Sequence, residues 1–124
     1  NLGVQWKCGQ ETGIRLMHLL LSAELLRRWG GATSRTPLLR IVEGHCRRIA
    51  RTMLYAIAQD NNHGTSEAAA LFAGGLFLAR YSEDRALTSR GSRWARMGRQ
   101  RLEERVAHLV SEDGSFSQHS TNYH

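Results

Sequence analysis

Residues 66–80 read SEAAALFAGGLFLAR. This stretch is apolar on nearly all sides and rich in alanine and glycine, so it predicts a helix that packs closely against several neighbours. Its strongly apolar part, residues 68–79, has about twelve residues, too few to span a bilayer. We therefore expect an inner helix and no membrane segment.

Three further helices are expected around this one, and no stretch alternates as a strand would. Residues 10–29 place apolar side chains at the helical gaps of three and four. These side chains are Ile14, Met17, Leu21 and Leu25. Residues 36–57 and 93–110 repeat the same spacing, and the second of these carries arginine over much of its surface. The pattern predicts an all-α protein built from antiparallel helical hairpins.

The charge of the chain favours an anionic partner. Sixteen of its seventeen basic residues are arginine, and the formal net charge is +6. The planar guanidinium fork suits carboxylate, sulfate and phosphate alike. One class of function is therefore a non-catalytic helical-repeat module that binds nucleic acid or protein through arginine-rich faces. That class predicts a continuous basic stripe along residues 93–110.

Two polar segments are expected to share one rim of the molecule. Residues 60–65 precede the inner helix and residues 111–124 follow the last helix, and two antiparallel helices of similar length bring these segments together. Asn62 and His63 are expected just before the inner helix, where free backbone N–H groups favour an anion. A zinc site is a weaker alternative because paired ligand spacing is lacking, and we expect no metal in this chain. Its ligands would be His63, His119, His124 and Cys46.

Three motifs in this order carry a resemblance to a known family. They are NNHGTSEAAALFAGGLFLAR, an arginine-rich helix with tryptophan and LEERV, and the ending DGSFSQHSTNYH. From residue 6 to residue 124 the chain resembles the toroid domain of heparinase II/III-type polysaccharide lyases, which include alginate and oligoalginate lyases. The resemblance implies that residues 1–124 are a fragment of an incomplete (α/α) toroid, without the downstream β-sandwich domain and the metal that domain can hold. It also implies a periplasmic or secreted protein.

The family's reaction is β-elimination from a uronic acid, and the resemblance assigns roles to three residues. Asn62 and His63 would face the uronate carboxylate, which must be neutralised before the C5 proton can leave. Tyr123 would act either as both base and acid, or as the acid beside a His63 base. As a base, Tyr123 would need hydrogen-bonding or cationic neighbours that stabilise phenolate.

The same resemblance indicates substrate-binding residues. Trp6, Gln10 and Arg15 lie in WKCGQETGIR, which looks like the sugar-facing start of an inner helix, and His124 neighbours Tyr123. Some relatives carry Glu-Gln-Ser-Pro where this chain has QHST at residues 118–121, so the resemblance does not identify which polysaccharide is the substrate. The expected partner is an acidic polysaccharide, of glycosaminoglycan or alginate type, rather than nucleic acid. Self-association of the fragment is also expected, because inner toroid helices are normally covered.

Overall fold

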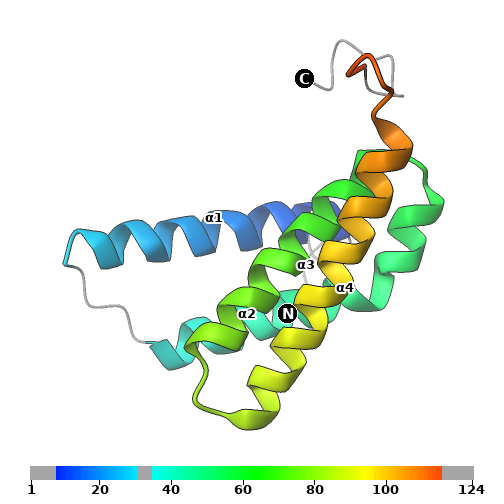
Figure 1. Cartoon of the computed structure of the whole chain (residues 1–124). Helices are drawn as coiled ribbons and strands as arrows, with labels where there is room; N and C mark the ends of the chain where they lie inside the picture. The colour runs from blue at the N-terminus through cyan, green and yellow to red at the C-terminus, as the bar shows by residue number, and fades with distance from the viewer. Residues whose placement is uncertain (1–7, 31–34, 116–124) are drawn as a thin grey trace.

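The computed structural model describes residues 8–30 and 35–115, which fold into four helices (Figure 1). They are α1 (Gly9–Arg28), α2 (Arg35–Ala58), α3 (Asn62–Tyr81) and α4 (Arg85–Leu109). Within the described ranges there is no strand, so the predicted all-α class is confirmed. None of the four helices is both long enough and apolar enough to cross a membrane.

Helix α3 lies at the centre of the arrangement and contacts each of the other three helices. In Figure 1, α3 and α4 run side by side as an antiparallel hairpin, while α1 and α2 cover other sides of α3. The core between the helices is apolar. Its fully buried members include Leu16 of α1, Val42, Cys46 and Ile49 of α2, and Leu71 and Leu78 of α3. This arrangement agrees with the prediction that residues 66–80 form an inner helix.

Glycine allows α3 and α4 to approach very closely. Gly75 of α3 and Gly91 and Gly98 of α4 are all buried in this contact. A β-carbon at Gly75 would lie 2.7 Å from the Gly91 carbonyl oxygen and would also collide with the backbone at Ala95. Side chains at these positions would therefore force the two backbones apart.

Helix α3 begins earlier than the sequence pattern predicted. Residues 60–65 were expected to form a loop, but the helix already includes Asn62. The reason is the cap: the Asn61 side chain accepts a hydrogen bond from the His63 N–H at 2.9 Å, which satisfies a donor of the first turn. Asn62 and His63 therefore lie inside the first turn of α3. In the same way, the Asp84 cap starts α4 at Arg85 rather than at residue 93.

The apolar stripe that predicted α1 points away from the core. Ile14, Met17, Leu21 and Leu25 are all exposed, Leu21 to 58% of its surface. The face that α1 buries consists of Thr12, Gly13 and Leu16. The three-and-four spacing correctly predicted a helix, but it did not mark the side that packs against α3.

Candidate functional site

The start of α3 and the end of α4 lie side by side, as the antiparallel arrangement predicted. Arg105 of α4 pairs with Asp60 at 2.6 Å, and His108 lies 3.2 Å from the same carboxylate. The Arg105 guanidinium, and then His108, lower the pKa of Asp60. Residues 111–115 follow directly from this end, so the described part of the second polar segment begins at the expected rim. Trp6, Tyr123 and His124 lie outside the described residues.

His63 lines a hollow of about 470 Å³, within the range of about 300–1,000 Å³ typical of ligand pockets. We call this space the His63 hollow. It is formed by the start of α1, the second half of α2 and the first two turns of α3. Its lining residues are Cys8, Gly9, Arg48, Thr52, Tyr55, Gln59, His63 and Glu67. Helices α2 and α3 thus bring a guanidinium, a phenol, an imidazole and a carboxyl group to one space, which the start of α1 borders.

Glu67 is the most unusual side chain of the His63 hollow. It is only 3% exposed, and its Oε2 atom is buried with no hydrogen-bond partner among the described residues. Burial raises the pKa of Glu67 to about 7, and the nearby positive charge of Arg48 opposes part of that rise. Glu67 follows His63 by four residues, so both side chains lie on one face of α3. The hollow therefore contains a carboxyl group that changes protonation near neutral pH.

Glycine at the start of α1 makes room for this carboxyl group. A β-carbon at Gly9 would collide with the Glu67 carboxylate. Any larger residue at position 9 would push Glu67 out of its place or move the start of α1. The position of Glu67 therefore depends on the residue type at Gly9 as well as on its own helix.

Asn62 differs from His63 in its surroundings. Its side chain is half-buried and does not line the His63 hollow. Its Oδ1 atom is buried without a hydrogen-bond partner in the described part of the chain, and its carbonyl oxygen accepts from the Ser66 hydroxyl at 2.9 Å. Neighbouring residues on a helix point in directions about 100° apart, which accounts for this separation. The Asn61 cap already uses the His63 N–H, one of the donors predicted to attract an anion.

The two described substrate-binding candidates of α1 lie away from the His63 hollow. Arg15 lines a separate shallow hollow on α1, together with Glu11, Ile14 and His18. Gln10 is half-buried at the start of α1 and is not among the residues that line the His63 hollow. The structure therefore places neither side chain beside His63.

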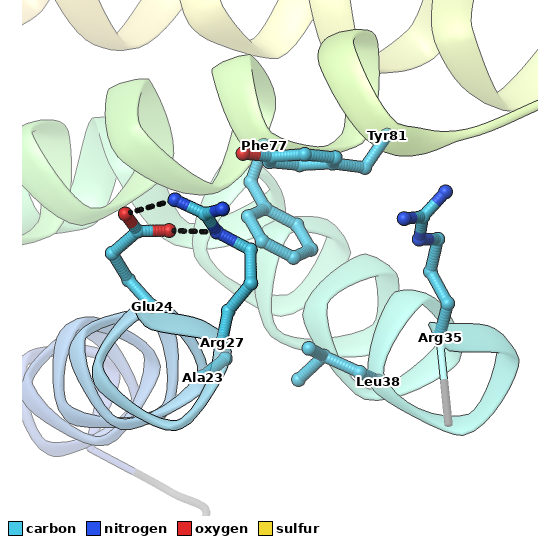
Figure 2. Close-up of a pocket in the computed structure, with 7 residues that line it drawn as sticks. All are labelled: Ala23, Glu24, Arg27, Arg35, Leu38, Phe77 and Tyr81. Atoms are coloured by element: carbon cyan, nitrogen blue, oxygen red, sulfur yellow. Dashed lines mark hydrogen bonds and ion pairs between the residues drawn. The ribbon is translucent and has the colours of Figure 1, made fainter. Parts of the chain in front are cut away.

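A second hollow, near the far end of α3, is shown in Figure 2. It measures about 80 Å³, well below the usual size of a ligand pocket. Arg27 is held there by two hydrogen bonds to Glu24, of 2.8 and 2.9 Å, and the Arg35 guanidinium lies 5.8 Å from the centre of the Tyr81 ring. Because this hollow is so small, we treat it as a packing contact between α1, α2 and α3.

Three residues of the His63 hollow were not predicted from the sequence, although the sequence carries a signal for each. Glu67 is the single acidic residue in the apolar stretch 66–80. Arg48 and Tyr55 belong to a polar face of α2 whose members recur at gaps of four, three and four. That face consists of Arg48, Thr52 and Tyr55, and it continues to Gln59 directly after the end of α2. The polar stripe of α2, considered together with its apolar stripe, indicates Arg48 and Tyr55 as candidates.

The described residues hold no group of three or more His, Cys, Asp or Glu side chains that could bind a metal ion. Cys46 lies in the core, and burial raises the pKa of its thiol to about 12, which disfavours the thiolate that a metal requires. His119 and His124 lie outside the described residues. Comparison with protein-family models, with curated proteins and with solved structures finds no match for this chain.

Proposed function

We propose that this chain forms part of a polysaccharide lyase that cleaves a uronic-acid-containing polymer by β-elimination. The observation that carries the proposal is the position of His63, in a ligand-sized hollow beside Arg48 and Glu67. The resemblance of residues 61–80 and 113–124 to heparinase II/III-type lyases supplies the reaction class. In this proposal the two hairpins belong to an (α/α) toroid.

The reaction breaks the C5–H and C4–O bonds of the uronate and forms a C4=C5 double bond. His63 is suited to accept the C5 proton, because an imidazole ring nitrogen with a free lone pair is a common general base. Tyr123 would then give a proton to the departing C4 oxygen, or would perform both transfers itself. Arg48 adds a positive charge next to His63, where negative charge develops on the substrate carboxylate.

The competing class, a helical module that binds nucleic acid, requires a continuous basic stripe along α4. Several α4 arginines are instead engaged by acidic groups. Arg99 pairs with Glu103 and Arg101 pairs with Glu104, both at 2.7 Å, and Arg105 pairs with Asp60. Interspersed charges of both signs weaken the field that a phosphate backbone would meet. This observation counts against the nucleic-acid alternative.

The proposal is tested by incubating the protein that carries this chain with heparan sulfate, hyaluronan, alginate and chondroitin. The unsaturated product absorbs ultraviolet light, so elimination can be followed directly. With the polymer that is cleaved, Tyr123→Phe should lower turnover by roughly 10²–10⁴-fold. Asn62→Ala should change turnover much less, because the Asn62 side chain does not line the His63 hollow.

Tyr81→Phe is the matched control for Tyr123→Phe. Tyr81 lies at the far end of α3, outside the residues that line the His63 hollow. Its variant should keep the turnover of the wild type. Elimination at a normal rate by Tyr123→Phe would contradict the role proposed for Tyr123, and the absence of product from all four polymers would contradict the proposed function.

A further inference from the structure

A buried carboxyl group with an unpartnered oxygen forms part of the His63 hollow. Glu67 is 3% exposed, and no described residue makes a hydrogen bond to its Oε2 atom. Leaving a buried polar atom without a partner is costly, and such atoms are rare in folded proteins. Because Glu67 lines a space of about 470 Å³, a ligand in that space can supply the missing partner.

The charges around Glu67 define which ligand fits. Helix α4 packs against another face of α3 and directs Arg105 to Asp60 instead. The titratable and charged groups that face Glu67 across the hollow are Arg48 and Tyr55 from α2, Cys8 at the start of α1, and His63 from α3 itself. Among the described residues, no second carboxylate lines this space. A hollow with one guanidinium and one neutral acid suits an anion that accepts hydrogen bonds, since a neutral carboxylic acid has an O–H to donate.

We propose that the His63 hollow binds the carboxylate of a uronate sugar between the Arg48 guanidinium and the neutral carboxylic acid of Glu67. This inference rests on the proposed function, because β-elimination needs that same carboxylate to be neutralised. An O–H donor and a guanidinium both form short, charge-assisted hydrogen bonds with a carboxylate. They would draw negative charge from the oxygens that gain it when the C5 proton leaves.

The binding should depend on pH in a definite direction. Burial raises the pKa of Glu67 to about 7, so below that pH the acid keeps its proton and can donate to the ligand. Above it, Glu67 becomes an anion and repels the uronate carboxylate. Through Glu67, affinity should be constant on the acid side and should fall about tenfold for each pH unit on the basic side, in addition to any change that His63 contributes.

The experiment measures the binding of two probes to the chain by calorimetry from about pH 5.5 to 8.5, on either side of the Glu67 transition. The probes are a mannuronate tetrasaccharide and a hyaluronan tetrasaccharide. The same two molecules with their carboxyl groups reduced to alcohols serve as controls. Uronate probes should bind at least tenfold more tightly than the reduced ones below neutral pH, and equal binding would overturn the proposal.

Two variants of Glu67 separate its role from a purely structural one. Glu67→Gln keeps an N–H donor but cannot ionise, so its affinity should stay within about threefold of the wild type at low pH and should lose the part of the pH dependence that Glu67 contributes, leaving the contribution of His63. Glu67→Ala should lose about tenfold or more. Glu83→Gln, an exposed position outside the hollow, should keep the wild-type profile. A Glu67→Gln profile that falls as steeply as the wild-type profile would overturn the proposal.

A direct titration gives a second readout that does not depend on affinity. With carbon-13-labelled glutamate, nuclear magnetic resonance follows the Glu67 carboxyl itself, and saturating uronate should raise its pKa because the ligand binds the protonated form. An unchanged or lowered pKa would contradict the proposal. If the protein catalyses elimination while Glu67→Gln binds uronate with the same pH profile as the wild type, the proposed lyase function is retained and this carboxylate site is rejected. If uronate binding depends on Glu67 but no elimination occurs, the carboxylate site is supported and the lyase function is rejected.

Discussion

Helices α1 and α3 have the same length of 20 residues but very different surroundings. Helix α3 buries eight residues and touches all three other helices, whereas α1 buries three and exposes its apolar stripe. The sequence difference lies in the small residues, which let neighbouring backbones approach α3 on several sides. Apolar spacing therefore predicts that a segment is helical, while alanine and glycine content predicts how many neighbours it has.

The largest effect should come from two leucines of α1 that differ in burial. Leu16 is completely buried in the core, while Leu21 is 58% exposed. Leu16→Ala should lower the free energy of unfolding by about 2–5 kcal/mol, and Leu21→Ala by about 0.5 kcal/mol or less. Urea unfolding of both variants measures this difference. Equal losses would mean that the α1 stripe is covered within the molecule, which would contradict the stated difference in surroundings between α1 and α3.

Stability should also depend on pH through Glu67. Its folded-state pKa is about 7, above the ordinary value of 4.5, so between those pH values the folded chain keeps a proton that the unfolded chain has lost. The free energy of unfolding should therefore fall by about 3 kcal/mol as the pH rises through this window, and this contribution should be flat above it. Glu67→Gln should remove that fall, as measured by unfolding at several pH values. Glu83→Gln should retain it.

A smaller loss should follow from widening the contact between α3 and α4. Gly75→Ala places a methyl group against the backbone of α4 and should cost about 1–3 kcal/mol. Gly44→Ala in α2 is the matched control, because no atom lies within 4 Å of a β-carbon at that position. It should stabilise the chain by about 0.5–1 kcal/mol, since alanine favours helix. Thermal unfolding of both variants measures these changes in stability. A stabilising Gly75→Ala or a destabilising Gly44→Ala would contradict the prediction.

The smallest effect on stability should come from the exposed stripe of α1, which should act instead on self-association. We expect two copies to pair through this stripe in antiparallel fashion, which would bring Glu11 of each copy toward Arg28 of the other. Leu21→Glu should weaken this association at least tenfold, with a stability change within about 0.5 kcal/mol. Ser22→Glu, which adds the same charge beside the stripe, is the control. Sedimentation over a range of concentrations tests both, and a wild type that stays monomeric would contradict the expectation.

The sequence predicted the helices well because periodicity and turn residues are local signals. It missed the start of α3, because the pattern treated residues 60–65 as a turn while the Asn61 cap admits Asn62 to the helix. It also could not show that α1 turns Ile14 and Leu21 outward, because burial depends on which neighbours are present.

The candidate site was predicted only in part, for a similar reason. His63 stood out as a titratable residue in a polar segment next to the inner helix. Arg48 and Glu67 did not, because a basic residue on a helix face and an acid within an apolar stretch become informative only when folding brings them together. Asn62 was predicted to act with His63, but adjacent helical residues point in different directions, and only His63 lines the hollow.

If the His63 hollow is the site of β-elimination, the ultraviolet assay should separate His63→Ala from His18→Ala. His18 is an exposed histidine of α1 outside the hollow, so its variant controls for the loss of a histidine. With the polymer that the wild type cleaves, His63→Ala should lower turnover by roughly 10²–10⁴-fold, and His18→Ala should leave it unchanged. Equal turnover by the two variants would contradict the claim.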